Sequence, residues 1–454
     1  MKRLILIVSL FAGLGMSSCR VYRAYQRPDL RAIDSLYRQP LPADTASLAD
    51  LSWRELFTDP LLQQLIDSGL MHNSDLRIAQ LRVTEAQASL TASRLAYLPS
   101  VSLTPQGTVN APEKVSMTRT FDLAASAEWE IDLFGKLLNE KRGAAAILAQ
   151  QEAYRQAVET LLVATIANSY HTLLMLDRQL EITRGTSEIW AENVRVMQAL
   201  KRAGQTTEMA VAQSVAEQSS VEGSVVALER QINETENALC VLLGATPRSI
   251  ERSSLDGQQF PDSPATGIPL QLLHRRPDVR QSEAALAAAF YATNTARAAF
   301  YPSITLGGTA GWTNAAGAVV TNPGQWLFTA VGSLVEPLFT RGRNRANLKI
   351  ARAQQEEALV NFRQSLLTAG AEVNDALVQW QTARQRLVLD NRQIEALRSA
   401  LHSAELLMQH SSQNYLEVLT ARQSLLQAEL DAASDHFDAI QGVINLYHAL
   451  GGGY

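Results

Sequence analysis

The chain carries the same sequence pattern twice, and this repeat limits its possible folds more than any local signal. Asp75-Leu76-Arg77 returns as Asp278-Val279-Arg280, and Leu98-Pro99-Ser100-Val101 returns as Tyr301-Pro302-Ser303-Ile304, each 203 residues later. Both copies have the same order: a helical segment, a proline, two alternating segments, a Leu-Phe pair and a very long helix. A tandem repeat of this size predicts one architecture built from two halves, rather than two or three unrelated globular domains.

The composition is typical of long helices that pack on one another. Aromatic residues make up only 6% of the chain, and Ala and Gln are frequent. Lys and Arg number 40 against 45 Asp and Glu, so the net charge of −5 counts against nucleic acid as the main partner. The sequence holds no nucleotide-binding motif, no HExxH motif and no nucleophile elbow, and its seven histidines are scattered. We therefore expect no enzymatic activity, no metal site and no bound cofactor.

The N-terminus carries an export signal. Lys2-Arg3 is a basic start, Leu4 to Leu14 is an apolar run, and Met16-Ser17-Ser18 is a small-residue approach to Cys19. The run is shorter than the roughly 20 residues of a membrane-spanning helix, which indicates a signal peptide. The cysteine after the small pair resembles the lipobox of bacterial lipoproteins, in which Cys19 would carry a diacylglycerol and an N-acyl chain. The alternative is an ordinary signal peptide with an incidental cysteine.

Long heptad-like stripes predict two antiparallel helical hairpins. Segments 136–200 and 341–410 would each be roughly 100 Å long at about 1.5 Å per residue. In the second segment, apolar residues recur in steps of three and four from position 359 to position 408, and Asp390 is the one polar member of fifteen. We interpret such a stripe as packing between helices. The sequence leaves open whether the remaining polar face lines a tube or meets bulk water.

The segments after the prolines, within 100–132 and 302–336, alternate between apolar and polar residues, as membrane barrel strands do. The first segment is predicted to be a short strand because it carries Pro105. Four strands cannot close a barrel, since the smallest membrane barrels use about eight, and open edges are not viable in lipid. Three chains would supply about twelve strands. The alternative is a soluble sandwich. Between positions 121 and 132, apolar residues alternate with a mostly polar set: Phe121, Leu123, Ala125, Ala127, Trp129 and Ile131 against Asp122, Ala124, Ser126, Glu128, Glu130 and Asp132.

These features divide the chain into four parts. Residues 1–18 are the predicted signal peptide, and residues 19–72 form an N-terminal periplasmic segment. The first repeat spans 73–270 and the second spans 271–454. Each repeat is expected to contain a helix, two strands and a long helical hairpin.

Several motifs resemble those of the outer membrane factors of the TolC/NodT type, in particular the lipoprotein branch that serves RND efflux. The likeness covers nearly all of the chain beyond the signal peptide, and the joint order and spacing of the motifs are specific. The motifs are Glu128-Trp129-Glu130-Ile131-Asp132-Leu133-Phe134-Gly135-Lys136, Arg275-Arg276-Pro277-Asp278-Val279-Arg280, Ala296-Arg297-Ala298-Ala299-Phe300-Tyr301-Pro302-Ser303, Asn414-Tyr415-Leu416-Glu417-Val418-Leu419 and Leu450-Gly451-Gly452-Gly453.

The resemblance implies a fold of mixed α and transmembrane β-barrel type. A homotrimer would form a 12-stranded barrel in the cell outer membrane, continuous with a 12-helix coiled-coil tunnel across the periplasm. Such proteins are exit ducts that pass small molecules from an inner-membrane RND-type transporter and a periplasmic adaptor protein to the exterior. A duct for type I polypeptide secretion would have the same fold and stays open as an alternative. A purely structural or adhesive trimeric coiled coil also stays open.

The resemblance further implies a gate at the periplasmic tip. In the family, the start of the last long helix carries acidic residues that face the narrowing tunnel. By motif these positions are Glu417 and Thr420, where the family often has Asp, and Tyr415 is expected at the same aperture. Converging carboxylates would repel one another and attract cations. The alternative is that Glu417 is an exposed surface glutamate near a hairpin turn. The hairpin tips are expected to contact the adaptor, through Arg202, Gly204, Ser412 and Asn414.

Overall fold

The computed structural model describes most of the chain as two compact units. The first comprises Met1–Asp29, Arg82–Glu152 and Gln281–Arg363, and the second comprises Leu30–Leu81, Ala153–Arg280 and Gln364–Tyr454. The described residues are 22, 24–29, 36, 47–111, 113, 117–260, 266, 272–313, 325–410 and 415–452. Cys19, Ser412 and Asn414 lie outside them.

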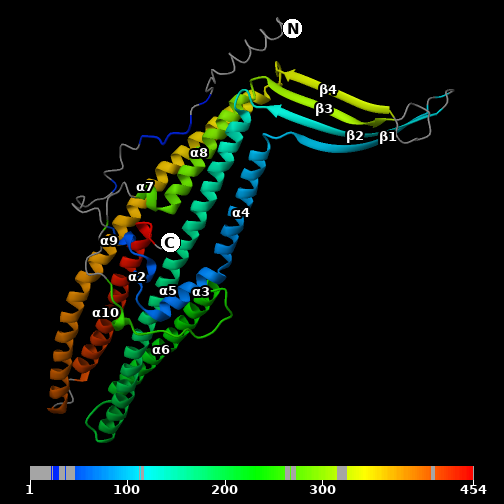
Figure 1. Ribbon diagram of the computed structural model, residues 1–454. Coiled ribbons are helices and arrows are strands. Elements are labelled where there is room, and N and C mark those ends of the chain that lie inside the picture. The colour runs from blue at the N-terminus through cyan, green and yellow to red at the C-terminus, as the bar shows by residue number, and fades with distance from the viewer. Residues whose placement is uncertain are drawn as a thin grey trace. The chain divides into compact units, whose positions relative to one another are not determined.

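The element order repeats along the chain, as the sequence predicts (Figure 1). The short elements and the first copy are η2 (Leu48–Asp50), α2 (Trp53–Leu56), α3 (Pro60–His72), α4 (Ser74–Leu95), β1 (Ser100–Asn110), β2 (Thr118–Ile131), α5 (Lys136–Arg202), α6 (Glu208–Leu242) and η3 (Leu255–Gly257). The second copy is α7 (Leu272–Arg275), α8 (Pro277–Ala298), β3 (Ser303–Thr313), β4 (Gln325–Val335), α9 (Arg343–His410) and α10 (Tyr415–Ala449).

The four strands form one antiparallel sheet in the order β1-β2-β3-β4, within the first unit. The two halves of the chain therefore meet at the β2–β3 pair. The expectation of a short first strand was wrong, because β1 has 11 residues, as β3 and β4 do. Within the sheet of one chain β1 is an edge strand, where the missing backbone N–H of Pro105 need not interrupt the pairing with β2.

The register aligns the alternation of all four strands, so that the sheet has one polar and one apolar face. Residues directly opposite one another share a face. One row of partners is Ser102, Ser126, Thr309 and Thr329, and the adjacent row is Leu103, Ala125, Ala310 and Phe328. The alternation predicted from the sequence is confirmed.

The apolar face of the sheet is not covered by the described part of the chain. Phe328 is 82% exposed, and Trp326 and Leu334 are also largely exposed. Trp312 and Trp326 pack on each other with ring centroids 4.6 Å apart, but no helix of the described chain shields them. A contiguous exposed apolar surface of this kind marks a binding or membrane-contact surface.

Among the helices that the structure describes, none combines the length and the hydropathy that a bilayer-spanning helix requires.

In the second unit, α5 with α6 and α9 with α10 form the predicted hairpins. All fifteen stripe positions from 359 to 408 on α9 are buried or half-buried, which confirms their packing role. Leu366 and Val373 lie in the core with Ile440 and Ile444 of α10. Their burial provides the main stabilisation of these helices, since isolated helices gain little from propensity alone.

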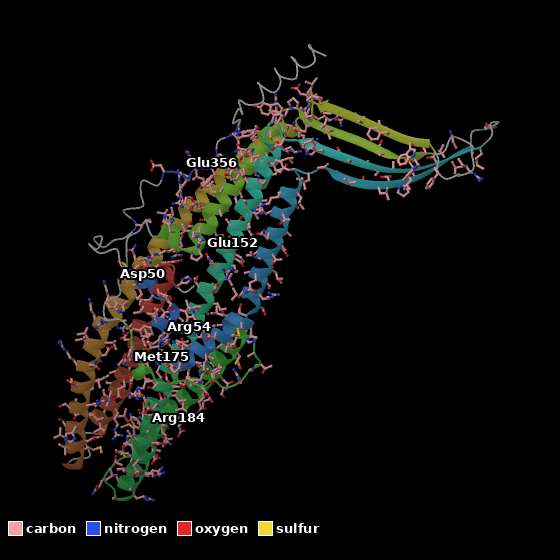
Figure 2. All side chains as sticks on the ribbon, viewed as in Figure 1. Asp50, Arg54, Glu152, Met175, Arg184 and Glu356 are labelled. Carbon is pink, nitrogen blue, oxygen red and sulfur yellow. The ribbon has the colours of Figure 1, made fainter. Side chains whose placement is uncertain are left out.

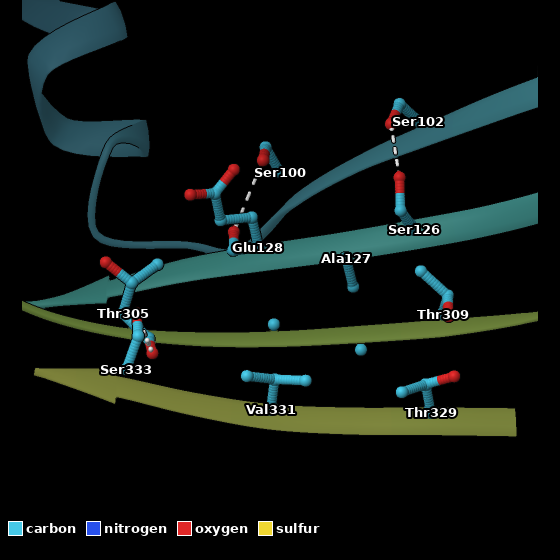
Figure 3. A pocket seen from close by; sticks show the side chains of 12 residues that line it. Ser100, Ser102, Ser126, Ala127, Glu128, Thr305, Thr309, Thr329, Val331 and Ser333 are labelled. Carbon is cyan, nitrogen blue, oxygen red and sulfur yellow. Dashed lines mark hydrogen bonds between the residues drawn. The ribbon is translucent and has the colours of Figure 1, made fainter.

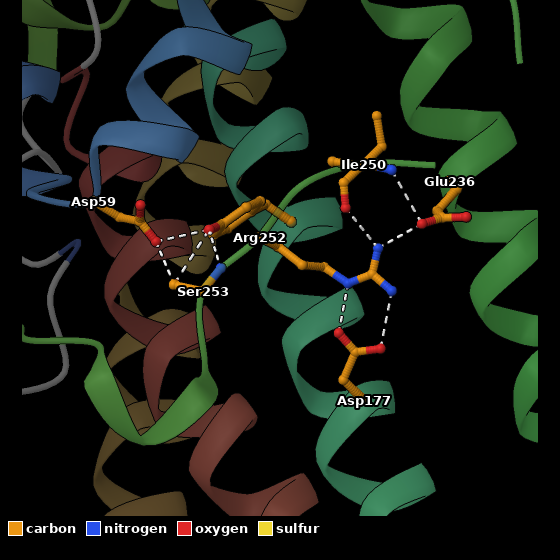
Figure 4. Close-up of polar contacts among 7 residues, drawn as sticks. Asp59, Asp177, Glu236, Ile250, Arg252 and Ser253 are labelled. Carbon is orange, nitrogen blue, oxygen red and sulfur yellow. Dashed lines mark hydrogen bonds and ion pairs between the residues drawn. The ribbon is translucent and has the colours of Figure 1, made fainter. Parts of the chain in front are cut away.

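A salt-bridge cluster fastens the segment after α6 to the first hairpin (Figure 4). The Arg252 guanidinium donates two hydrogen bonds to the Asp177 carboxylate of α5, at 2.5 and 2.9 Å. It also donates to Glu236 of α6 at 2.5 Å. A two-pronged guanidinium–carboxylate pair fixes geometry as well as charge, so this arginine sets the path of the chain between the two repeats.

Two of the sequence motifs meet in the second unit. The buried Arg276 donates to the Ala449 carbonyl at 2.9 Å and pairs with Asp278 and Glu372. Gly451 follows α10 with φ of +85°, and a Cβ there would lie 2.8 Å from the Arg275 carbonyl carbon. The Arg-Arg-Pro-Asp and terminal glycine motifs are therefore explained by packing of the chain end against the start of α8.

Candidate functional site

The polar face of the sheet is a hydroxyl-lined surface with a shallow cavity of ≈ 330 Å³ (Figure 3). Ser102 and Ser126 are joined by an Oγ–Oγ hydrogen bond of 2.7 Å. Gly307 has no side chain, which leaves the cavity open between the flanking strands. Such a surface exchanges hydrogen bonds with water and suits contact with an aqueous solute.

Every charged side chain that the described strands place on this polar face is acidic. Asp122, Glu128 and Glu130 all lie on β2, at alternate positions of the same face. The Lys136 ammonium, at the start of α5, lies 3.0 Å from Glu130 and offsets one of these charges. Water at this face therefore experiences a negative potential, which attracts cations.

The tip of the first hairpin is described completely. Gly204 has φ of +70°. The Gln205 N–H donates to the Leu200 carbonyl at 2.9 Å, and the Gly204 N–H donates to the Lys201 carbonyl at 3.0 Å. This is the glycine-dependent helix ending in which a left-handed residue satisfies the last carbonyls. Arg202 is exposed beside it. The predicted tip residues Arg202 and Gly204 are thus together at the turn.

The ends of the two hairpins are joined by an apolar cluster in the second unit, which we call the tip cluster. Trp190 and Met197 of α5 are each 1% exposed and lie at its centre. Leu419 belongs to the opposite hairpin, so the cluster joins α10 to α5 and α6. The stripe on α5 predicted that Trp190 is packed, but no sequence pattern predicted its partner. The members are Trp190, Met197, Ala210, Val211, Val221 and Leu419, with Leu200, Met408 and Leu426 against them.

Glu417 lies in the first turn of α10, which begins at Tyr415. Its side chain is exposed, whereas the two residues that follow it are buried. Thr420 is exposed one turn later and donates its hydroxyl to the Leu416 carbonyl at 2.9 Å. Residues three apart lie on the same helix face, so Glu417 and Thr420 point the same way. The placement fits either a surface glutamate or a ring formed with further copies of the chain.

Both halves of the chain are similar to known proteins. The family model described as outer membrane efflux protein matches residues 65–245 and 268–452, once in each half of the chain. The probable outer membrane lipoprotein SilC of Salmonella typhimurium is 31% identical over 438 residues, which are 95% of this chain and 94% of SilC. The cation efflux system protein CusC of Escherichia coli (strain K12) is 30% identical over 455 residues, covering 97% of this chain and 98% of CusC.

Solved structures show the same fold. The outer-membrane channel OprN superimposes with a TM-score of 0.86 at 27% identity, over 96% of this chain and 99% of the OprN chain. The likeness therefore extends over both the sheet and the long helices.

Proposed function

The chain belongs to the outer membrane efflux protein family, and from this we infer that it forms the homotrimeric exit duct of a tripartite pump. It is an outer membrane channel of the efflux class, and this activity is transport rather than catalysis. We propose that small molecules reach it from an inner-membrane RND-type transporter through a periplasmic adaptor.

The observation that carries the proposal is the two-faced sheet. Its apolar face is exposed, its opposite face carries hydroxyls and carboxylates, and β1 and β4 are edge strands of the described sheet. In lipid each unpaired backbone group costs several kcal/mol, so the edges must be paired. Three copies supply about twelve strands, enough to close a barrel with a wet interior.

The assembly can be tested directly. Purified in mild detergent, the protein should sediment as a trimer, and in planar bilayers it should give discrete conductance steps, because closure of the barrel needs three chains. Analytical ultracentrifugation and single-channel recording measure the two properties. A monodisperse monomer that still conducts would contradict the proposal.

Two glycines of β3 provide a matched pair for the same assay. A Cβ at Gly311 would lie 2.2 Å from the Leu123 carbonyl oxygen, whereas a Cβ at Gly307 would meet nothing nearer than 3.9 Å. Gly311→Ala should therefore reduce the trimer yield, and Gly307→Ala should leave it unchanged. Equal yields from the two variants would mean that the sheet is not the element that closes the trimer.

The hairpin tips, with Arg202 and Gly204 exposed at the first turn, are the proposed contact with the adaptor. Ser412 and Asn414, which the sequence predicts at the second tip, lie outside the described residues. The protein resides in the outer membrane, and Cys19 is the proposed site of its lipid anchor. The repeat boundaries at 73–270 and 271–454 are proposed in line with the two family matches.

Glu417 is the proposed aperture residue, supported by its exposure in the first turn of α10. Three copies of its carboxylate around a constriction would attract cations. Glu417→Gln should therefore reduce cation selectivity in single-channel recordings and weaken block by multivalent cations. Glu251→Gln removes an exposed carboxylate from the segment after α6 and serves as the control. If conductance and selectivity stay at the wild-type values in both variants, Glu417 is a surface residue.

A further inference from the structure

The only polar member of the α9 stripe, Asp390, lies within the packed seam between α9 and α10. Its exposed fraction is 8%, and that of Asp435 on α10 is 2%. Both residues belong to the second unit. An ionised carboxylate is costly to bury unless hydrogen-bond donors and opposite charge surround it. Neither the fold nor the duct explains why two carboxyl groups occupy one apolar seam.

The donors around this pair are too few for two ionised carboxylates. Asp390 Oδ2 and Asp435 Oδ2 are both buried without a hydrogen-bond donor. The Arg386 Nε atom lies 2.9 Å from Asp435 Oδ2, but the pair does not have hydrogen-bond geometry and the arginine side chain is 55% exposed. Solvent screens such a half-exposed guanidinium. Asp438, one turn further along α10, adds a third negative charge nearby.

These surroundings favour the protonated acid. Burial, a hydrogen bond with Asp390 and the charge of Asp390 together raise the pKa of Asp435 to about 6, against the opposing charge of Arg386. Burial also raises the pKa of Asp438, again against Arg386. A proton on Asp435 has a carboxyl oxygen of Asp390 as its acceptor.

We propose that Asp390 and Asp435 form a proton-binding site in the α9–α10 seam, in which one shared proton bonds the two helices and its loss loosens them. A proton between the two carboxyls adds a donor to a seam in which Asp390 Oδ2 and Asp435 Oδ2 lack one. The neighbouring residues of the α9 stripe are apolar and carry no donor that could replace the proton: Leu387, Ile394 and Leu397.

A cavity of ≈ 480 Å³ lies beside the seam, and neither Asp390 nor Asp435 lines it. Asn391 and His436, which follow Asp390 and Asp435 in sequence, both line it. The other charged groups in this cavity come from α5, η3, α9 and α10 and are largely paired with one another. Arg398 contacts Glu429 at 2.7 Å, His436 Nδ1 lies 3.8 Å from Asp256, and Arg178 contacts Glu181 at 2.7 Å. No set of three or more side chains arranged to hold a metal ion occurs in the described part of the chain.

The sign of the pH dependence follows from linkage. The pKa of Asp435 is higher in the folded protein than the ordinary value of 3.8, so the folded state holds the extra proton between these values. Stability from this site is therefore present at low pH and is lost as the pH rises from about 4 to above 6. Burial lowers the pKa of His436, so this imidazole is a second candidate for titration and needs its own control.

Thermal unfolding of the full-length protein between pH 5 and pH 7.5 tests the site. In Asp390→Asn the amide donates permanently to Asp435, so the midpoint at pH 7.5 should rise by roughly 3 °C and its pH dependence should flatten. Glu395→Gln, an exposed carboxylate of α9, and His436→Gln should both keep the wild-type pH dependence. A wild-type pH profile retained in Asp390→Asn would overturn the proposal.

Infrared spectroscopy of the wild-type protein supplies a readout that does not depend on stability. A carbonyl band of a protonated carboxylic acid should titrate near pH 6 and should disappear in Asp390→Asn and in Asp435→Asn. It should persist in Asp438→Asn, which separates the pair from its acidic neighbour. Absence of the band at pH 5 in the wild-type protein, or its survival in Asp435→Asn, would also overturn the proposal.

Discussion

Replacing Arg276 by alanine should lower the free energy of unfolding by about 1–3 kcal/mol, because a buried charged donor is lost while the two carboxylates stay partly exposed to solvent. The side chain is 3% exposed and makes contact with Asp278, Glu372 and the Ala449 carbonyl. Without the guanidinium, two carboxylates face each other without a cation, and the Ala449 carbonyl loses a donor. The chain end would then separate from the start of α8.

Chemical denaturation followed by circular dichroism measures this loss, and an exposed pair in the same unit serves as the control. Arg184 of α5, labelled in Figure 2, contacts Glu229 of α6 at 2.6 Å, and both side chains are about half exposed. Arg184→Ala should cost less than about 1 kcal/mol. Adding Asp278→Asn and Glu372→Gln to Arg276→Ala should restore part of the stability. Equal losses in Arg276→Ala and Arg184→Ala would show that burial does not strengthen the Arg276 contacts.

The Arg276 cluster and the Asp390–Asp435 pair should respond to pH with opposite signs. Burial would raise the pKa of Asp278, but its hydrogen bond with Arg276 and the guanidinium charge lower it below the ordinary value of 3.8. Stability from Asp278 is therefore present above pH 3.8 and is lost as the pH falls through the lower folded value. In the Arg276→Ala variant this acid-induced loss should be absent.

Replacing Trp190 by alanine should cost about 3–5 kcal/mol, the usual range for deleting a fully buried tryptophan from a core. Trp190 is 1% exposed at the centre of the tip cluster, where Leu419 of α10 packs against helices of the other hairpin. Its removal leaves a cavity that weakens packing on both hairpins at once. The first turns of α10, which include Glu417, should therefore become more mobile although the substitution lies on α5.

Hydrogen exchange read by mass spectrometry locates this effect. Amides near Leu419 and at the end of α5 should exchange faster in Trp190→Ala. Ile189→Ala is the matched control, because Ile189 is the preceding residue of the same helix and is 50% exposed. Its exchange pattern should stay close to that of the wild-type protein. Faster exchange confined to α5 and α6 would mean that the tip cluster does not couple the hairpins.

The sequence by itself determined the elements whose signal lies in local spacing. Apolar steps of three and four place one helix face in a core, and alternate residues place one strand face on each side of a sheet, whatever the partners are. The repeat, the two long helices and the amphipathic strands were therefore predictable. The position of Glu417 near a helix start was predicted from the resemblance to the family. The length of β1 was not, because Pro105 disfavours a central strand but is compatible with an edge strand.

Only the tertiary structure decided which faces and side chains meet. The same alternation in β2 and β3 is compatible with several registers, and the observed one joins Ser126 to Thr309 from different halves of the chain. Trp190 and Leu419 share the tip cluster although they lie far apart in sequence. The same is true of Asp390 and Asp435, which pair across the seam between α9 and α10. Their energies arise from burial and from the groups that surround them, and spacing along the chain carries no information about either.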